Sequence, residues 1–196
     1  MRLYYSPTSP YVRKVVACAI ACGLDKQITW VVTNPHESPP ELLADNPLSK
    51  VPCLVTGDGL ALFDSPVICE YLDYVGTGSL FPPPGPLRWR ALKLQAIGDG
   101  IMDAAVGRRG EMGRPQEDAR AASMARHADA VRRALDNLEA TSLADHLDIG
   151  TISVACALGY LDLRFADDAW REGRPQLAGW YAAVQQRPEI AETAPP

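Results

Sequence analysis

Two serine-proline steps carry residue types that could bind an anionic ligand. Ser9-Pro10 and Ser65-Pro66 each predict a helix start, with the serine as N-cap and the proline at the first helical position. The free backbone N–H groups and the dipole at such a start attract negative charge. Helix capping alone also explains both serines, so a binding role needs support from elsewhere in the chain.

The step Val51-Pro52 supplies a different kind of binding feature. It opens a short apolar stretch, and proline has no N–H to donate to a sheet. If the bond is cis, the chain turns and offers the N–H and C=O of Val51 as a short edge for a peptide ligand. The alternative is an ordinary trans proline that opens an edge strand. Two anion sites with a pairing edge would together suit an anionic peptide.

The elements that must position these steps follow the order strand, helix, strand, helix, strand, strand, helix. We predict strands at residues 3–5, 28–32, 51–55 and 60–63. Apolar residues at helical spacing predict a helix after residue 10, and a second long helix begins near residue 65. Residues 35–44 hold at most a short helix. The last two strands form an antiparallel hairpin around Gly57-Asp58-Gly59.

A proline-rich stretch divides the chain into two expected domains. Residues 81–86 cannot continue a helix or a central strand, so we predict a linker at residues 77–86. Beyond it the strand signal disappears and apolar residues recur at helical spacing. The expected organisation is an α/β domain at residues 1–76 and an all-α domain at residues 87–196. We expect its helices to be interrupted at 107–115, 141–147 and 173–175.

The composition excludes several function classes. A net charge of -5 argues against a nucleic-acid-binding protein. No apolar run is long enough to span a bilayer and the chain starts without an apolar leader, so no membrane partner is expected and the cytoplasm is the expected location. The five cysteines form no C-x-x-C pair, and the three histidines are scattered. We therefore expect neither a disulfide framework nor a metal site.

The motifs together resemble one known family. N-P-L-S-K-V-P-C-L at residues 46–54 and L-F-D-S-P-V-I-C-E-Y-L at residues 62–72, after a strand and a serine-rich turn, are similar to the cytosolic glutathione transferases. The resemblance covers nearly the whole chain and is nearest to short bacterial members, with some similarity to the zeta and omega groups. It implies a thioredoxin-like N-terminal domain, an all-helical C-terminal domain, glutathione as co-substrate, a homodimer and a role in detoxification.

The resemblance also implies a glutathione site. The main chain of Val51, before the cis-proline Pro52, would pair with the cysteinyl part of glutathione. Ser65 and its helix start would hold the α-carboxylate of the γ-glutamyl end, and Asp64 its ammonium group. Lys50 could reach the glycyl carboxylate or could be a solvated surface lysine.

Some classes of the family add an acid from the partner subunit to this site. Asp99 is the better-placed candidate here, with Asp103 one helical turn further on. Both lie among apolar residues, so a role in the subunit interface or in helix capping is the alternative.

The catalytic group of the family stands at the start of the first helix. The omega pattern has a cysteine at the position of Ser9, and a serine cannot form a mixed disulfide. Ser9 could instead donate a hydrogen bond to the glutathione thiolate. Thr8 is an alternative donor, Tyr5 could be mistaken for the tyrosine of other classes, and Ser9 could act only as a cap. Strand alternation points Cys53 into the core, so we interpret it as a packing residue.

The second substrate would bind to the first-helix loop, Tyr11 and the segment at 107–114. Arg108, Arg109 and Arg114 in that segment could favour an anionic electrophile, or the segment could be a solvated loop. The leading expectation is a glutathione transferase that conjugates glutathione to a small electrophile. One alternative is a glutathione-dependent disulfide reductase or peroxidase. Another is a non-catalytic module that binds glutathione or a protein, because fold alone does not fix function.

Overall fold

The protein consists of two compact units in the computed structural model, which describes residues 1–76 and 78–194. The first unit contains Met1–Arg88 and also the segment that begins at Pro188, and the second contains Trp89–Arg187. Thr77, where the expected linker begins, and the last two residues lie outside the described residues.

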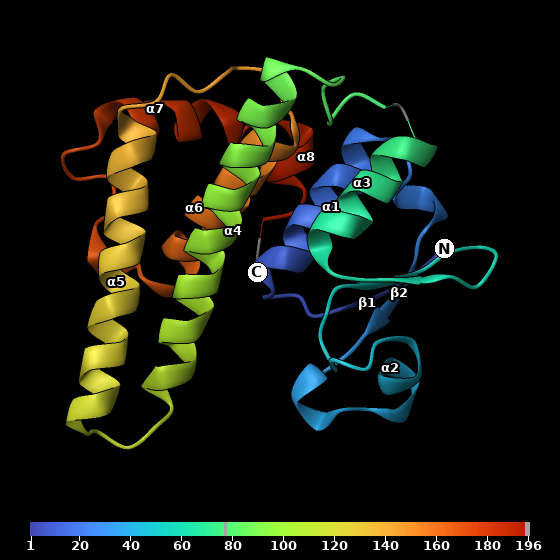
Figure 1. Ribbon diagram of the computed structural model, residues 1–196, viewed down its shortest axis with the longest axis horizontal. Coiled ribbons are helices and arrows are strands. Elements are labelled where there is room, and N and C mark those ends of the chain that lie inside the picture. The colour runs from blue at the N-terminus through green and yellow to red at the C-terminus, as the bar shows by residue number, and fades with distance from the viewer. Residues whose placement is uncertain (77, 195–196) are drawn as a thin grey trace. The chain divides into compact units, whose positions relative to one another are not determined.

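A four-stranded mixed sheet forms the centre of the first unit (Figure 1). The strands are β1 (Arg2–Tyr5), β2 (Thr29–Val32), β3 (Cys53–Val55) and β4 (Ala61–Leu62), in the spatial order β2-β1-β3-β4. β1 pairs in parallel with β2, while β3 runs antiparallel to both β1 and β4. Leu3 on β1 is paired with Leu54 on β3, and both residues are fully buried. This pair therefore lies at the centre of the core of the first unit.

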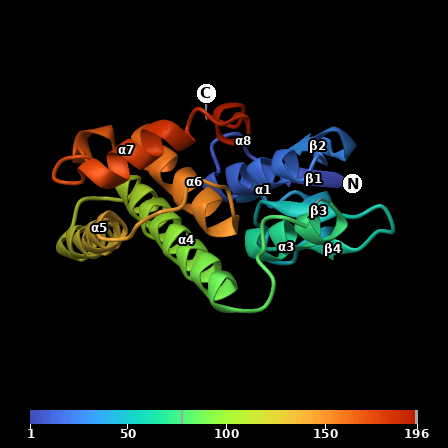
Figure 2. The same cartoon turned by 90° about the horizontal axis from the view of Figure 1, so that it is seen from above.

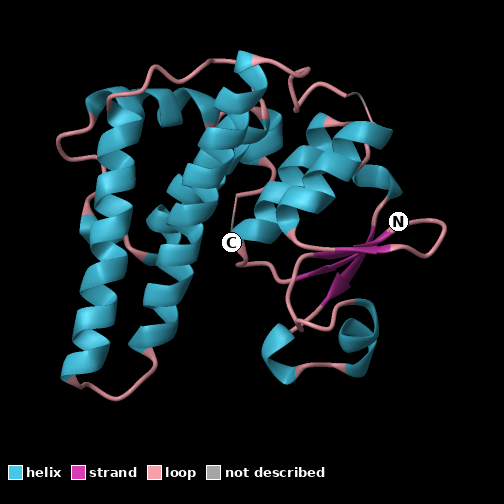
Figure 3. Ribbon diagram, in the orientation of Figure 1, coloured by secondary structure: helices cyan, strands magenta, loops and turns pink. Residues whose placement is uncertain are grey.

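Helices cover both faces of this sheet (Figure 3). α1 (Pro10–Ala21) and α3 (Ser65–Val75) pack against each other on one face, and α2 (Pro40–Asp45) lies on the other. Short 3-10 helices at Asp25–Gln27 and Pro35–Glu37 complete the connections. The predicted order of strands and helices is therefore confirmed.

The end of the chain returns to the first unit. A short helix, α8 (Pro188–Ala191), packs on α1, and Ile190 is fully buried. The buried guanidinium of Arg13 on α1 donates from Nη2 to the carbonyl oxygen of Ile190 at 3.1 Å and from Nε to Thr193 Oγ1 at 3.4 Å. In the sequence this segment follows the helical half of the chain, but in the structure it belongs with α1.

The second unit is built from helices. Its main elements are α4 (Pro86–Met112), whose first residues belong to the first unit, α5 (Asp118–Glu139), α6 (Ile149–Arg164), the 3-10 turn Ala166–Asp168 and α7 (Pro175–Val184). α6 is buried from Ile149 to Leu161 and forms the core of this unit. A capping box starts α6, because Asp148 and Thr151 exchange two hydrogen bonds of 2.8 Å. None of the described helices is long and apolar enough to cross a membrane.

The expected helix break at 107–115 is wrong in its first part, because α4 continues through Gly107 to Met112. Glycine weakens a helix interior by only about 1 kcal/mol, and packing can offset that loss. A Cβ on Gly107 would lie 3.0 Å from the side chain of His127 on α5. This glycine therefore allows two helices to approach each other, and the interruption falls between Met112 and Asp118.

Candidate functional site

Three segments of the first unit meet at one edge of its sheet. Tyr4 near the end of β1 lies opposite Cys53 at the start of β3, and Leu54 lies opposite Leu62 at the end of β4. The turn after β1, the loop before β3 and the turn after β4 must therefore occupy the same edge. These turns lead into the starts of α1 and α3, so both helix N-termini lie there (Figure 1).

Ser9 caps α1 at this edge, as predicted. Its backbone is extended, with φ -78° and ψ 122°, and its Oγ accepts a hydrogen bond of 3.3 Å from the N–H of Val12. Because the hydroxyl uses a lone pair in this bond, its own proton is left to donate to another group. Ser9 is partly buried, whereas its neighbour Thr8 is exposed.

The loop before β3 is held by Asn46, a residue that the sequence analysis did not single out. Asn46 is 1% exposed. Its Nδ2 donates to the carbonyl oxygen of Lys50 at 2.9 Å, and its Oδ1 accepts from the N–H of Leu48 at 3.0 Å. The sequence Asn-Pro-Leu-Ser does contain a signal for such a turn, because asparagine side chains commonly bond to the backbone two residues on.

This loop presents the main chain of Val51 at the sheet edge. The Val51–Pro52 bond is cis. The ladder between β1 and β3 begins at Cys53 and does not include Val51. Pro52 is buried, Val51 is partly exposed and Lys50 is exposed. The edge therefore contains a peptide group outside the sheet ladder, with a lysine beside it.

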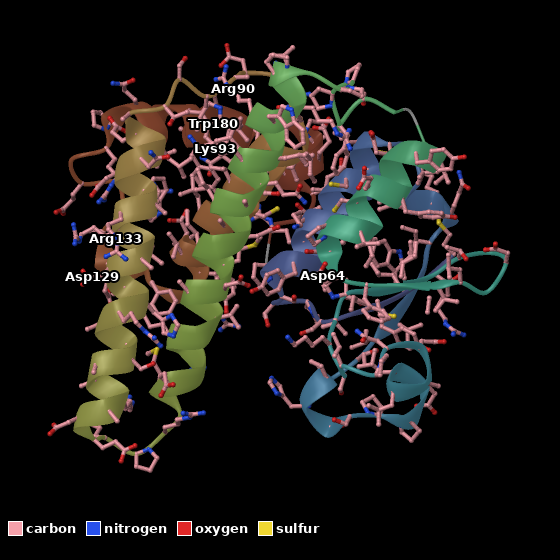
Figure 4. The ribbon with its side chains drawn as sticks, viewed as in Figure 1. Asp64, Arg90, Lys93, Asp129, Arg133 and Trp180 are labelled. Atoms are coloured by element: carbon pink, nitrogen blue, oxygen red, sulfur yellow. The ribbon has the colours of Figure 1, made fainter. Side chains whose placement is uncertain are left out.

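The start of α3 differs from the prediction by one residue. Asp64 is the N-cap, because its carbonyl oxygen accepts the N–H of Ile68 at 3.0 Å, and Ser65 is the first helical residue. Both Asp64 and Ser65 can cap a helix, and Pro66 fits the second helical position as well as the first, so the sequence pattern does not separate these registers. Ser65 is 2% exposed. The carboxylate of Asp64 makes no capping bond and is exposed at the helix start (Figure 4).

Cys53 is a packing residue, as predicted. It is fully buried beside Tyr4 and Leu42. Burial, and to a smaller extent the nearby Asp45 carboxylate, raises the pKa of the Cys53 thiol to about 11. Burial and a 2.8 Å hydrogen bond to Asp45 Oδ2 also raise the pKa of Tyr4. A thiol with such a pKa is almost entirely protonated at neutral pH and is a poor nucleophile.

The other predicted site residues are distributed over both units. Tyr11 lies in the first turn of α1 and is partly buried. Asp99 and Asp103 lie on α4 in the second unit, the first partly buried and the second exposed. Arg108 forms a two-pronged ion pair with Asp168 and lies over the ring of Phe165 at 4.4 Å.

Tyr5 is the residue that could be mistaken for the catalytic tyrosine of other classes. Its ring packs edge-to-face against the ring of Trp30, and the two centroids are 5.7 Å apart. Among the described residues there is no group of three or more histidine, cysteine, aspartate or glutamate side chains that could hold a metal ion.

Family models match both halves of this chain. The model of the glutathione S-transferase N-terminal domain matches residues 8–74, and that of the glutathione S-transferase C-terminal domain matches residues 121–183. A protein of Escherichia coli K12 described as the uncharacterized GST-like protein YibF is 36% identical over 204 residues, which cover 100% of this chain and 99% of the relative. The chain belongs to the glutathione S-transferase family.

Solved glutathione S-transferase structures share the complete fold. A family member from Pseudomonas fluorescens Pf-5 with bound glutathione has 44% identity and a TM-score of 0.94, over 100% of this chain and 98% of that one. A second structure from the same organism, with bound S-(propanoic acid)-glutathione, has 43% identity and a TM-score of 0.90 over 100% of both chains. The thioredoxin-like α/β fold followed by a helical domain, as expected for a glutathione S-transferase, is therefore confirmed.

Proposed function

We propose that this glutathione S-transferase family member conjugates the thiolate of glutathione to a small electrophile. The observation that carries the proposal is the sheet edge at which two helix starts and the Val51 peptide group occur together. Such an edge offers groups for an anionic, peptide-like ligand: N–H donors for carboxylates and a main-chain partner for its amide groups.

Each part of glutathione has a partner at this edge in our proposal. The start of α3 and Ser65 bind the α-carboxylate of the γ-glutamyl end, and the exposed carboxylate of Asp64 binds its ammonium group. The N–H and C=O of Val51, next to Pro52, pair with the cysteinyl residue. Lys50 binds the glycyl carboxylate. In a homodimer, the partner subunit's Asp99 or the partner subunit's Asp103 would add a second carboxylate for the ammonium group.

Ser9 supplies the activating hydrogen bond. Lowering the pKa of a thiol from about 8.5 to about 6.5 requires that the site favour the anion by about 2.7 kcal/mol. A hydroxyl that donates to a charged acceptor contributes about 1.5–3 kcal/mol, and a helix start about 0.3–1 kcal/mol. Ser9 at the start of α1 combines both effects and has a proton to donate. The thiolate sulfur then forms a bond to the electrophilic carbon and a leaving group departs, or a proton adds to the product.

A carboxylate on the second substrate is compatible with what a relative binds. The Pseudomonas fluorescens protein was solved with S-(propanoic acid)-glutathione, in which an acid is attached to the glutathione sulfur. In our proposal Tyr11 contributes to the acceptor site of this cytoplasmic enzyme. Arg108 is already paired with Asp168, so its guanidinium offers no unbalanced charge to an acid.

The test is the Ser9→Ala variant, with Thr8→Ala as the matched control one residue away. The ultraviolet absorbance of the thiolate reports the pKa of bound glutathione during a pH titration. We expect Ser9→Ala to raise that pKa by about 1 to 2 pH units, since about 1.5–3 kcal/mol of thiolate stabilisation is lost, and Thr8→Ala to leave it unchanged. An identical titration in wild type and Ser9→Ala would contradict the role of Ser9.

A substrate panel separates conjugation from the other glutathione chemistries. Haloarenes, epoxides and enones report conjugation, whereas mixed disulfides and hydroperoxides report reduction. We expect turnover in the first group. Turnover confined to the second group would replace the proposed transferase by a reductase or peroxidase.

A further inference from the structure

The loop between α2 and β3 contains a serine in a backbone conformation that serine rarely adopts. Ser49 has a φ of 50°, in the left-handed region that favours glycine. Its N–H donates to the carbonyl oxygen of Asn46 at 3.0 Å, which closes a tight turn. Lys50 and Val51, which bind glutathione in the proposed function, follow directly in the chain. A residue in such a conformation persists where its surroundings hold it, so the surroundings of Ser49 matter.

The side chain of Ser49 ties this turn to a segment more than ten residues earlier in the chain. Its Oγ lies 3.0 Å from the carbonyl oxygen of Pro35 and 3.0 Å from Ser38 Oγ. A hydroxyl has one proton and two lone pairs, so Ser49 can donate to the carbonyl, which has no proton, and accept from Ser38. Both partners belong to the 3-10 helix Pro35–Glu37 or cap it. Ser49 therefore connects the loop to residues 35–38.

The beginning of the loop is held independently of Ser49. Asp45, the last residue of α2, accepts at Oδ2 from the hydroxyl of Tyr4 at 2.8 Å and from Arg2 Nη2 at 2.9 Å. Both donors lie on β1, so the end of α2 is fixed to the sheet. The bond from Ser49 adds a connection to a third segment, which constrains the loop just before its glutathione-binding residues.

These bonds fix the backbone on both sides of Lys50. Ser49, which precedes it, is held through its own N–H and its hydroxyl. The carbonyl oxygen of Lys50 accepts from Asn46 Nδ2 at 2.9 Å. With the backbone set before and after the α-carbon, the direction of the Cα–Cβ bond is set as well. The exposed lysine side chain therefore leaves the loop in one defined direction.

We propose that Ser49 is a positioning residue, whose hydroxyl fixes the direction of Lys50 and thereby its contact with the glycyl carboxylate of glutathione. The inference rests on the proposed function, because it explains how one contact of that site is made. A glycine at position 49 would adopt the left-handed backbone more easily but would have no hydroxyl to bond to Pro35. Serine in this position thus accepts a less favourable backbone and gains a connection to residues 35–38.

The test compares glutathione with γ-glutamylcysteine, which lacks the glycyl residue. Calorimetric titration of the full chain at neutral pH gives both affinities. Ser49→Gly keeps the backbone conformation and removes the hydroxyl. We expect it to lower the affinity for glutathione by about three- to tenfold, as for the loss of a hydrogen bond, and to leave that for γ-glutamylcysteine within about twofold of wild type. A hydroxyl that only stabilises the fold would not distinguish the two ligands.

Two further serine and threonine variants calibrate this result. Ser38→Gly removes a hydroxyl from another left-handed position, and it should cost less affinity for glutathione than Ser49→Gly, because the bond between Ser49 and Pro35 remains. Thr29→Ala is the control, since it removes an exposed hydroxyl on β2 and should leave both affinities as in wild type.

A double substitution tests whether Ser49 acts through Lys50. Lys50→Ala removes the ammonium group and should by itself lower the affinity for glutathione but not that for γ-glutamylcysteine. Ser49→Gly added to Lys50→Ala should then cause no further loss, because the group that it positions is gone. Losses that multiply in the double variant would show that Ser49 acts on another part of the site and would overturn the inference.

The remaining outcomes separate the inference from the proposed function. Unchanged glutathione affinity in Ser49→Gly, or an equal loss for both ligands, overturns the inference and leaves the proposed function standing. Failure of wild type to bind glutathione overturns the proposed function, and the inference with it. If Ser49→Gly does not fold, as judged by circular dichroism, Ser49→Ala and the Lys50→Ala pair with Ser38→Gly decide the question by the same comparison of ligands.

Discussion

Burial sets the ionisation of Cys53, which directly follows the cis-proline Pro52. The thiol lies among Tyr4 and Leu42, and its pKa is raised from 9.0 to about 11. The residue that the sequence places beside the proposed binding edge is thereby kept protonated at neutral pH. The pKa that matters for the proposed reaction is instead that of the thiol of glutathione.

The raised pKa of Cys53 predicts a loss of stability at alkaline pH. The folded state favours the protonated thiol, so the contribution is complete below pH 9 and is lost as the pH rises from about 9 to about 11. A shift of this size corresponds to at most about 3 kcal/mol. Urea unfolding at several pH values should show a steeper alkaline decline in wild type than in Cys53→Ala. Parallel declines would contradict the prediction.

The sequence predicts a residue's role correctly where that role depends only on its neighbours along the chain. Ser9 before Pro10 predicts a cap, and the cap forms. The choice between Asp64 and Ser65 was not predictable, because either residue can cap and only the fold selects the register. Asn46 was missed because its two bonds close only when the chain has already turned toward Lys50.

Contact between α4 and α6 depends on small residues in both helices. A Cβ on Gly98 would lie 2.6 Å from the carbonyl carbon of Ser153, and one on Gly150 would lie 2.5 Å from the carbonyl oxygen of Ala91. The two helices lie side by side in both cartoon views (Figures 1 and 2). Sequence periodicity predicts the helices, but it does not distinguish a glycine that interrupts a helix from one that makes space for a neighbour, as Gly107 illustrates.

Gly98 and Gly100 on α4 provide a matched pair of substitutions. Gly98→Ala should lower the free energy of unfolding by about 1–3 kcal/mol, because the new methyl group overlaps backbone atoms that cannot move away easily. Gly100 has no atom within 4 Å of its Cβ position, so Gly100→Ala should raise stability by about 0.5–1 kcal/mol. Chemical denaturation measures both. Similar effects of the two substitutions would show that the close contact is not the cause.

At the scale of the whole molecule, the first unit is discontinuous in sequence. Its strand and helix order was predictable because proline, glycine and apolar patterns separate the elements. The return of α8 was not predictable, because four residues carry too little periodicity to indicate a helix or its partner. The decisive contacts join Arg13 to Ile190 and Thr193, nearly the full length of the chain apart.

The contact of α8 with α1 predicts that a change near the carboxyl end weakens the first unit. Ile190→Ala removes a fully buried side chain and should destabilise that unit by about 2–5 kcal/mol. The exposed neighbour Glu192 provides the control, since Glu192→Ala should change stability by less than about 0.5 kcal/mol. Hydrogen exchange of the α1 amides, followed by mass spectrometry, locates the effect. Unchanged protection of α1 in Ile190→Ala would refute this assignment.

The same contact orders events during synthesis. A ribosome makes β1 and α1 before the helical unit, but α8, which packs on α1, is made after that unit. The contacts of Arg13 with Ile190 and Thr193 therefore form only after α8 has been made. The α/β unit is thus begun before the helical unit and completed after it, and a bulky insertion directly after α8 would act on the unit that contains β1 and α1.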